Sequence, residues 1–479
     1  MLLTTTIPYV NARPHIGFLL ELVQADVLAR HHRRRGEPVR LQTGTDDNSL
    51  KNVLAAQAAG VEVREFVDRN AAAFVALHEP YSLSFDDVLR TSSDPRHRAG
   101  VERLWHACAH DLYRKHYEGS YCVGCEQFYP AAELVGGRCP EHGVPPERVA
   151  EENWFFRLSR YADPLRAAIE EGRLRIHPAQ RRNEVLAFLA GGLEDISVSR
   201  DTARARGWGI PVPGDPDQVI YVWWDALGNY VTAPGEAAWR AADKRIHLLG
   251  KGVLRFHAVY WPAALLSAGL PLPTDIAVHD YLTVDGRKIS KSGPATADPG
   301  ELATRFGADA VRWWLLRDVP RVGDTDFTVE RLVGRANDEL VNGIGNLVHR
   351  VTSMVHRYRD GVVPEGGEDL PFDHDGVDDA LAAYDFRQAS GVVWAFVTRA
   401  NRYVSQARPW ALDDEQARDG VLATLVRACR ALADELAPFL PATAARIGER
   451  CTPVAGRLPV PARLFERFDL ATTGPSGLV

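Results

Sequence analysis

Residues 1–46 read MLLTTTIPYVNARPHIGFLLELVQADVLARHHRRRGEPVRLQTGTD, and this stretch decides the fold. Residues 2–7 are rich in β-branched side chains and predict a short strand. Residues 15–35 carry apolar side chains at a helical period, and Gly36 follows where a helix end favours glycine. Residues 39–42 predict a second strand. Strand, loop, helix and strand in this order begin a βαβ unit, so we expect a parallel α/β sheet.

The remaining sequence predicts an interrupted sheet and a helical end. Residues 118–148 hold turn residues and four candidate metal ligands, which indicates an insertion. Strand-like runs at residues 219–224, 246–249 and 276–278 are expected to resume the sheet. After about residue 330 the apolar patterns become long and helical and predict an all-α bundle. These helical patterns cover residues 331–359, 377–407 and 415–450.

Composition narrows the class of protein. The chain has 479 residues, of which 46% are hydrophobic and 25% charged, the balance of a globular protein. No apolar run approaches the ~18–20 residues that cross a membrane, and the first residues do not read as a signal peptide. A net charge of −7 argues against non-specific wrapping of nucleic acid. We expect a cytoplasmic enzyme whose arginine-rich stretches, residues 30–35 and 96–103, are solvated helix faces.

Four residues have the spacing of a zinc knuckle, Cys122-x2-Cys125-x13-Cys139-x2-His142. Two close ligand pairs separated by a short loop suit a tetrahedral site with three sulfur ligands and one nitrogen ligand. Four protein ligands fill the coordination sphere, so we expect a structural zinc ion; the alternative is a knuckle that has lost its metal. The other cysteines lack such spacing and are expected to be small core residues. They are Cys108, Cys429 and Cys451.

Two further stretches suit phosphate binding. His15 begins the first predicted helix, where backbone N–H groups attract anions and a histidine can donate to a phosphate oxygen. Gly17 leaves room for an approaching nucleotide. Residues 286–292, GRKISKS, place Lys288 and Lys291 among serine hydroxyl groups on a glycine-flanked loop, which suits a triphosphate attacked at its α-phosphorus. Taken singly, each stretch also fits a structural role: His15 could only cap its helix, and residues 286–292 could be a flexible basic loop.

Together these stretches resemble the HIGH and KMSKS signatures of the class I aminoacyl-tRNA synthetases. They read here His15-Ile16-Gly17-Phe18 and Lys288-Ile289-Ser290-Lys291-Ser292. Other stretches narrow the resemblance to the methionyl-tRNA synthetases, and it covers essentially the whole chain. These stretches are IPYVNARPHIG (7–17), TGTD (43–46), EENWFFRLSRY (151–161), ARGWGIPVPGD (205–215), VWWDALGNYV (222–231), FHAVYWPA (256–263) and GADAVRWWLLRDVP (307–320).

The resemblance implies an α/β fold: a class I Rossmann-type parallel sheet as catalytic core, with a zinc-knuckle insertion, followed by an all-α helical bundle. Five parts are expected along the chain. They are residues 1–115, the first half of the catalytic domain; 116–215, a connective insertion with the knuckle at about 118–148; 216–285, the second half of the catalytic domain; 286–335, the KMSKS-type loop and stem-contact region; and 336–479, a helical domain similar to anticodon-binding domains.

The resemblance also implies the site residues. His15, Lys288 and Lys291 are expected to be catalytic by stabilising phosphate charge. ATP, with Mg²⁺ held mainly by its phosphates, is expected at His15, Gly17, Phe18, Gly250, Gly252, Lys288, Ser290 and Lys291. Methionine or an analogue is expected at Ile7, Tyr9, Asp46, Trp223, Ala226, Leu227, Tyr230, Phe256, His257 and Trp261. The anticodon of the methionine tRNA is expected at Asn342, Asn346, Arg350 and Trp410.

Physical chemistry supports parts of this assignment without the resemblance. A thioether favours an apolar, polarizable cage, and an ammonium group favours a carboxylate. Asp46 is the candidate carboxylate, although Asp47 could compete with it. Asn342, Asn346 and Arg350 follow one another at a helical spacing and can contact unpaired bases, or they can make ordinary polar contacts between helices.

Four positions depart from the family pattern. Phe18 replaces the second histidine of the HIGH signature. Gly252 stands where the family has an acidic residue that helps to hold the ribose. Residues 47–49 read Asp-Asn-Ser where Glu-His-Gly is usual, and residues 293–297 read Gly-Pro-Ala-Thr-Ala where Leu-Gly-Asn is usual. Loss of one preorganised donor costs ~10²–10³ in rate, so these changes favour a slower, specialised paralogue.

Three functions therefore stay open. The first is a methionyl-tRNA synthetase, which forms an aminoacyl-adenylate with ATP and transfers the amino acid to tRNA. The second is a tRNA-independent amino acid ligase of secondary metabolism, in which a small amine or hydroxylamine takes the amino acid, as on routes to an N–N bond. The third is a catalytically inactive tRNA-binding paralogue. We expect a monomer without a separate editing domain.

Overall fold

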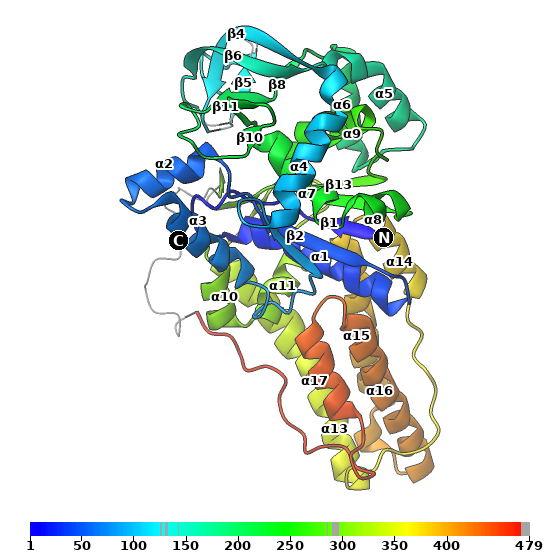
Figure 1. The fold of residues 1–479 in the computed structure, drawn as a ribbon. Helices are drawn as coiled ribbons and strands as arrows, with labels where there is room; N and C mark the ends of the chain where they lie inside the picture. Colours follow the sequence, from blue (N-terminus) through cyan, green and yellow to red (C-terminus); the bar gives the residue numbers. More distant parts are fainter. Residues whose placement is uncertain (125–126, 130–132, 142, 285, 290–296, 471–479) are drawn as a thin grey trace. The chain divides into compact units, whose positions relative to one another are not determined.

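The chain folds into two compact units. The computed structural model describes residues 1–124, 127–129, 133–141, 143–284, 286–289 and 297–470 (Figure 1). The first unit, named the sheet unit, comprises Met1–Pro14, Glu37–Ala76 and Phe85–His279. The second unit, named the helical unit, comprises His15–Gly36, Leu77–Ser84 and Asp280–Val479.

A six-stranded sheet in the order β3-β2-β1-β12-β13-β7 forms the centre of the sheet unit. All of its neighbouring strands are parallel, and Leu3 lies opposite Leu41 on one side and Ile246 on the other. The strands are mostly buried, as the apolar runs of a parallel sheet require. They are β1 (Leu2–Thr4), β2 (Arg40–Thr45), β3 (Asp87–Arg90), β7 (Arg175–His177), β12 (Arg245–Gly250) and β13 (Asp275–His279). The predicted parallel α/β core is confirmed.

Eight helices and one π-helical turn belong to the sheet unit in the described part of the chain. They are α2 (Leu50–Ala58), α3 (Val63–Val75), α4 (Pro95–Ala107), α5 (Ala162–Glu170), α6 (Ala179–Ala190), α7 (Val222–Thr232), α8 (Glu236–Ala241), α9 (Trp261–Ser267) and the π-helical turn η5 (Phe256–Tyr260). Helices α4 and α7 approach closely, because a Cβ on Gly100 would lie 2.2 Å from Cγ2 of Thr232. Any side chain at Gly100 would push the two helices apart.

Two smaller sheets of antiparallel strands lie between residues 112 and 220. One sheet has the order β5-β4-β6-β8, and a smaller one has the order β10-β11-β9. The strands are β4 (Leu112–Cys122), β5 (Gln127–Tyr129), β6 (Glu147–Phe156), β8 (Ile196–Ser197), β9 (Ser199–Asp201), β10 (Pro211–Val212) and β11 (Asp215–Ile220). Short 3₁₀ turns in this unit are η1 (Ala109–Asp111), η3 (Leu158–Tyr161) and η4 (Lys251–Val253).

One strand prediction was wrong. Residues 219–224 were expected to resume the parallel sheet, but β11 ends at Ile220 in the small antiparallel sheet. Helix α7 begins two residues later, at Val222. Because a short apolar run fits both a buried strand and a buried helix, its period cannot separate the two. The predicted strands at residues 246–249 and 276–278 lie in β12 and β13, as expected.

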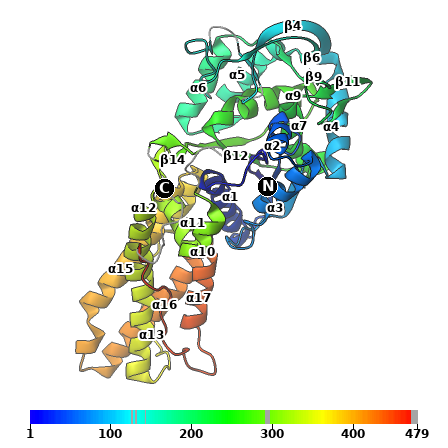
Figure 2. The same cartoon turned by 90° about the vertical axis from the view of Figure 1, so that its left-hand side faces the viewer.

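The helical unit ends in a bundle in which α13, α15, α16 and α17 run side by side (Figures 1 and 2). A small sheet in the order β15-β14-β16 precedes it. The elements are α1 (Ile16–Arg34), β14 (Leu282–Val284), β15 (Arg287–Lys288), α10 (Pro299–Phe306), α11 (Ala308–Arg317), β16 (Thr325–Asp326), α12 (Val329–Arg335), the π-helical η6 (Ala336–Gly345), α13 (Asn346–Arg359), α14 (His374–Ala382), α15 (Phe386–Ala407), η7 (Pro409–Ala411), α16 (Glu415–Leu436) and α17 (Pro441–Cys451). The predicted helical end is confirmed.

The predicted helix over residues 415–450 is two helices. Helix α16 ends at Leu436, and α17 begins at Pro441. Proline at the first position of a helix has no N–H to lose, whereas inside a helix it breaks the hydrogen-bond pattern. Cys429 in α16 and Cys451 at the end of α17 are fully buried, as is Cys108 in the sheet unit. All three cysteines are therefore the small core residues that were predicted.

The basic stretch of α1 is partly exposed, and it also forms ion pairs that the sequence did not predict. Arg30 pairs with Asp26 at 2.8 Å, and Arg34 pairs with Glu435 of α16 at 2.5 Å. Arg35 pairs with Asp378 of α14. Glu435 and Asp378 lie hundreds of residues away in the sequence, so the pattern of α1 alone could not reveal these two partners.

In the second arginine-rich stretch, residues 96–103, Arg96 pairs with Asp87 and Asp94, at 3.0 and 2.6 Å.

Within the described ranges, no helix is both long enough and apolar enough to span a membrane.

Candidate active site

His15 caps the helix that follows it. It is the N-cap of α1, and its Nδ1 accepts a hydrogen bond from the backbone N–H of Gly17 at 3.1 Å. Because Nδ1 accepts, a neutral imidazole carries its proton on Nε2, which makes Nε2 the donor that a phosphate oxygen needs. A Cβ on Gly17 would lie 3.0 Å from the His15 ring. A side chain at position 17 would therefore crowd the ring that caps the helix, in addition to the nucleotide clearance predicted from the sequence.

The segment after the KMSKS-type loop returns to the start of α1. Lys288 lies in β15, opposite Thr283 of β14. The backbone N–H of Ile16, next to His15, donates to the carbonyl oxygen of Ala297 at 3.0 Å. Ser290 and Lys291 lie outside the described residues. The hydrogen bond joins the start of α1 to the residue that follows the KMSKS-type loop, within the helical unit, although about 280 residues separate them in sequence.

The other residues predicted to bind ATP belong to both units. Phe18 lies in α1 and is buried, with 9% of its surface exposed. Gly250 ends β12, and a Cβ there would lie 3.3 Å from Cε1 of His279. Gly252 is exposed in the following turn, η4. Both glycines therefore lie at the carboxyl end of a central parallel strand, the edge at which open α/β sheets bind ligands.

Asp46 lies at the same edge of the sheet. It directly follows β2, its backbone N–H donates to Pro8 at 2.9 Å, and it forms a backbone bridge with Tyr9. Its side chain is almost completely buried. Ile7 lies next to this strand, since a Cβ on Gly44 would be 3.0 Å from its Cγ2. Asp46, Tyr9 and Ile7 thus form one side of a common site.

Aromatic side chains form the other side. Trp223 stacks on Phe256, with ring centroids 3.7 Å apart and planes at 11°. Its edge meets Tyr9 at 6.3 Å, and it lies 6.4 Å from His257. Tyr230 lies 6.0 Å from Trp261. The predicted amino-acid residues therefore come together within the sheet unit. Ala226 and Leu227, the remaining two, are buried in α7.

Trp223 itself lies in an unexpected element. It was expected at a strand end, but it occupies the first turn of α7. Phe256 and His257 begin the π-helical turn η5, and such turns often occur at functional sites. Two helical segments thus form the aromatic wall. The apolar run at residues 219–224 could be buried in a helix as well as in a strand, so the sequence alone did not identify the helix.

A hydrogen-bond chain fixes the His257 ring. Its Nδ1 lies 2.9 Å from the carbonyl oxygen of Val253, and its Nε2 lies 2.8 Å from the hydroxyl of Tyr230. A carbonyl only accepts, so Nδ1 carries a proton and donates to it, while Nε2 shares a hydrogen bond with the Tyr230 hydroxyl. Both side chains are buried. The orientation of the His257 ring in the aromatic wall is therefore fixed.

Asp47 is committed to a structural network and cannot be the second candidate carboxylate. Thr45 donates to its Oδ1 at 2.8 Å, and Arg90 and Ser92 donate to its Oδ2, each at 2.7 Å. The side chain is fully buried. These contacts argue against Asp47 as the ammonium-binding carboxylate and are consistent with the prediction of Asp46.

The predicted anticodon residues lie on the helical unit. Asn342 in η6 and Asn346 at the start of α13 are exposed. The Arg350 guanidinium lies 5.8 Å from the centroid of the Trp410 ring, and Trp410 keeps 47% of its surface exposed. An exposed indole beside a cation suits base stacking better than a core role.

Half of the predicted zinc knuckle lies in the described residues. Cys122 and Cys139 are both buried and share a small apolar cluster with Tyr129 and Leu134. Cys125 and His142 lie outside the described residues. No group of three or more histidine, cysteine, aspartate or glutamate side chains suited to a metal ion occurs among the described residues, which include only two of the four knuckle positions.

Sequence reasoning missed a buried polar network beside the pocket, formed by Asn48, His97, Asp225 and Thr232. Two signals pointed to it. Asp225 is a charged residue inside the apolar VWWDALGNYV run, and Asn48 is one of the departures from the family pattern. His97 gave no separate signal, because it lies within the arginine-rich stretch.

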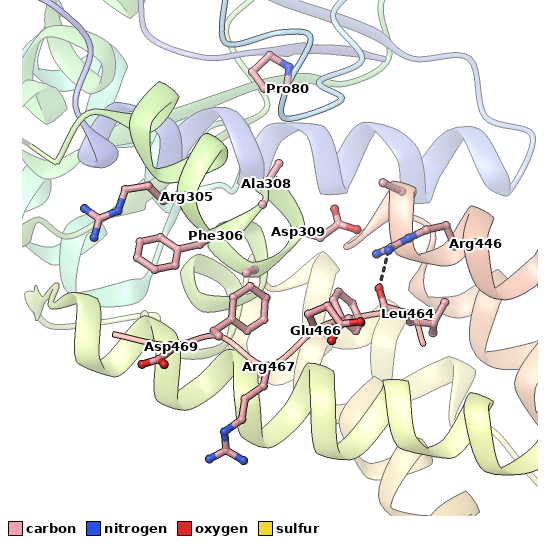
Figure 3. Close-up of a pocket in the computed structure, with 15 residues that line it drawn as sticks. Pro80, Arg305, Phe306, Ala308, Asp309, Arg446, Leu464, Glu466, Arg467 and Asp469 are labelled. Atoms are coloured by element: carbon pink, nitrogen blue, oxygen red, sulfur yellow. Dashed lines mark hydrogen bonds between the residues drawn. The ribbon is translucent and has the colours of Figure 1, made fainter. Parts of the chain in front are cut away.

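A separate cavity of about 590 Å³ lies in the helical unit (Figure 3). It is lined by the end of α10, the start of α11, α17 and residues 464–469. Arg446 donates to the carbonyl oxygen of Leu464 at 2.6 Å along one side. No predicted site residue is among those that line it in the described chain, so this cavity plays no part in the candidate active site.

Comparison with known proteins gives consistent matches. The family model described as tRNA synthetases class I (M) matches residues 1–149 and 142–352. The methionine–tRNA ligase of Brucella suis is 38% identical, with 97% of each chain covered. That of Streptomyces coelicolor is 38% identical over 93% of this chain and 88% of the other.

The structural match agrees with these relatives. The structure of Mycobacterium tuberculosis methionyl-tRNA synthetase in complex with methionyl-adenylate has a TM-score of 0.90 and 36% identity, and covers 97% of this chain and 99% of the other. Both the sheet unit and the helical unit are included in a match of that extent. The chain therefore belongs to the methionyl-tRNA synthetase family of class I aminoacyl-tRNA synthetases.

Proposed function

We propose that the chain is a methionine–tRNA ligase. A carboxylate oxygen of methionine attacks the α-phosphorus of ATP, pyrophosphate leaves, and methionyl-adenylate forms. A ribose hydroxyl at the 3′ end of the tRNA then attacks the carbonyl carbon, and AMP leaves. The observation that carries this proposal is the buried Asp46 carboxylate beside the aromatic cage of Trp223 and Phe256, in a chain of this family.

The pocket provides both contacts that methionine needs. Asp46 binds the ammonium group, and the cage of Trp223, Phe256, His257 and Tyr230 binds the thioether through its polarizable faces. The remaining wall residues are Ile7, Tyr9, Ala226, Leu227 and Trp261.

Phosphate charge is stabilised by preorganised donors. His15 presents Nε2–H because its Nδ1 is held by the helix, and Lys288 and Lys291 add positive charge from the loop. The reaction needs little more than positioning and charge stabilisation at the α-phosphorus. Mg²⁺ accompanies ATP and is held mainly by the phosphates. The nucleotide is further contacted by Gly17, Phe18, Gly250, Gly252 and Ser290.

The helical unit recognises the tRNA. Asn342, Asn346 and Arg350 contact unpaired anticodon bases, and Trp410 stacks on one of them. The exposure of both asparagines and the closeness of Arg350 to Trp410 support this role.

A structural zinc ion is part of the same proposal. Cys122, Cys125, Cys139 and His142 would hold it, and the shared burial of Cys122 and Cys139 fits such a site. Zinc there stabilises the insertion and takes no part in the reaction. We also propose a monomer in the cytoplasm with the functional parts 1–115, 116–215, 216–285, 286–335 and 336–479.

The comparisons do not favour the two rival functions. A ligase that acts on a small amine has no use for an anticodon-binding domain, yet the similarity to methionine–tRNA ligases extends over 97% of the chain. An inactive paralogue has no reason to keep the capped His15 and both loop lysines.

ATP–pyrophosphate exchange with each of the amino acids, with and without tRNA, tests the proposed activation step. Methionine-dependent exchange supports it. Exchange with a different amino acid would replace methionine as the substrate, and the absence of exchange with any amino acid would point to the inactive paralogue.

A further inference from the structure

A buried hydrogen bond joins the two sides of the amino-acid pocket. The backbone N–H of Asn48 donates to Oδ1 of Asp46 at 3.2 Å, and the Asn48 side-chain amide donates to Oδ2 of Asp225 at 2.7 Å. Asn48 has 9% of its surface exposed and Asp225 has 1%. Asn48 therefore connects the carboxylate side of the pocket to helix α7.

The other carboxylate oxygen of Asp225 also takes part in a hydrogen bond. Its Oδ1 lies 2.5 Å from Nε2 of His97 in α4, and Nδ1 of the same ring lies 2.8 Å from the Thr232 hydroxyl at the end of α7. His97 is fully buried. Helix α7 is thus fixed at its first turn and at its last residue, and the close approach of Gly100 to Thr232 leaves α4 and α7 little freedom to shift.

This arrangement has a consequence for the substrate. Asp46 lies two residues before Asn48, whereas Asp225 lies between Trp223 and Ala226 on the opposite wall. We propose, on the basis of the proposed function, that Asn48 is a positioning residue that sets the distance between Asp46 and helix α7. That distance determines how long an amino-acid side chain fits when its ammonium group is bound at Asp46.

The chemistry of Asn48 suits this role. An amide donates to the Asp225 carboxylate without adding charge. Among the contacts of the described residues, the charged or titratable groups beside this amide are Asp225, with His97 behind it, and Asp46 on the other side. Arg90 cannot compensate for a change here, because it is bound to Asp47 and Asp68. A carboxylate at position 48 would therefore face Asp225 at hydrogen-bond distance and hold a proton to a higher pH than an ordinary aspartate does.

The experiment compares the wild-type protein with Asn48→Ala and Asn48→Asp in methionine-dependent ATP–pyrophosphate exchange. For Asn48→Ala we expect a KM for methionine about tenfold higher, with kcat and the KM for ATP changed less than about twofold, because only the pocket width is affected. The relative kcat/KM for ethionine, one methylene longer than methionine, should rise.

Asn48→Asp gives a signature that a merely structural role would not. At low pH the protonated carboxyl donates to Asp225 as the amide does, so the KM for methionine should be close to that of the wild-type protein. As the pH rises from about 5 to 8 the proton is lost, the two carboxylates repel, and the KM should increase steeply. The wild-type protein and Asn48→Ala should lack this steep rise.

The matched control is Asn153→Ala, which removes another buried asparagine, one that donates to Glu151 within β6. Thermal unfolding of all variants separates loss of fold from loss of positioning. Equal changes in the KM for ATP and for methionine, an unchanged preference for ethionine, or a wild-type pH profile in Asn48→Asp would each overturn the inference.

Methionine binding followed by tryptophan fluorescence separates this inference from the proposed function. A wild-type protein that binds methionine without exchange would overturn the proposed function, while weaker binding by Asn48→Ala would still support the positioning role. A wild-type protein that binds no methionine would overturn both.

Discussion

Asp26 in α1 forms a fully buried ion pair with Arg312 in α11, with 2.8 Å between Oδ2 and the guanidinium nitrogen. Arg312 also donates to the carbonyl oxygens of Tyr81, at 3.0 Å, and Phe439, at 2.8 Å. Ser84 donates to the other oxygen of Asp26. The helix capped by His15 is therefore anchored to three other segments of the helical unit, which fixes the position of its N-terminus within that unit.

Removal of one residue of the Asp26–Arg312 ion pair should lower the free energy of unfolding. Arg312→Met removes the fully buried partner of the Asp26 carboxylate and leaves only the partly exposed Arg30 to pair with it, so the unfolding free energy should fall by up to about 3–5 kcal/mol. The double variant Asp26→Leu with Arg312→Met removes both charges and should lose less. Urea unfolding followed by tryptophan fluorescence measures the difference. A single variant no less stable than the double variant would show that the ion pair is not responsible.

The same pair predicts a dependence on pH. Burial raises the pKa of the Asp26 carboxyl, but Arg312, Arg30 and the hydrogen bond from Ser84 outweigh it and hold the pKa below its usual value. A lowered pKa contributes stability above the pH at which unfolded aspartate titrates, near 4, and that contribution is lost as the pH falls through the folded-state pKa. The stability gap between wild type and Arg312→Met should therefore narrow under strongly acidic conditions.

His15 has two roles that substitutions can separate. His15→Ala removes the phosphate donor and the helix cap, so exchange should slow by about 10²–10³ and stability should fall by about 1 kcal/mol. His15→Ser keeps a capping oxygen for Gly17 N–H but cannot reach a phosphate. We expect its stability to be near wild type and its exchange to be as slow as in His15→Ala. A fast His15→Ser enzyme would exclude His15 from phosphate stabilisation.

A substitution at Gly252 tests whether this departure from the family pattern weakens ATP binding. An acidic residue at this position helps to hold the ribose in the family, and a charge-assisted hydrogen bond is worth about 1.5–3 kcal/mol. Gly252→Asp should therefore lower the KM for ATP by about tenfold. The gain should disappear with an ATP analogue that lacks both ribose hydroxyls, and Gly252→Ala should show none. An unchanged KM for ATP in Gly252→Asp would mean that the chain holds the ribose by other groups.

Trp410 tests the role of the helical unit. Base stacking on an aromatic ring is worth about 1–3 kcal/mol, so Trp410→Ala should lower kcat/KM for tRNA by about five- to a hundredfold. Exchange without tRNA should not change, and Trp410→Phe, which keeps a ring beside Arg350, should lose less. Equal loss of charging and of exchange would assign Trp410 a structural role.

The parts that the sequence predicted correctly share a local signal. The first strand, the helix from Ile16 and the turn at Gly36, which has φ +78°, each follow from period and turn chemistry within a few residues. The paired signatures were also found, because each one is short and distinct. The helical end was predicted from long periodic runs, which are more reliable than short ones.

The parts that the sequence could not predict depend on distant partners. Trp223 was expected at a strand end because four or five apolar residues fit either element. The contacts of Asp47 with Arg90 and Ser92, which support Asp46 as the proposed ammonium-binding residue, depend on the three-dimensional structure. So does the His97–Asp225 pair, whose members are 128 residues apart. No local sequence pattern shows which buried charged residues pair with one another.

Charging of a CAU-anticodon tRNA transcript with labelled methionine tests the central claim most directly. A methionine–tRNA ligase should produce methionyl-tRNA in an ATP-dependent reaction, and a transcript with a changed anticodon should be charged far more slowly. Methionine-dependent pyrophosphate exchange with no detectable methionyl-tRNA would contradict the claim and show that the activated amino acid goes to a different acceptor.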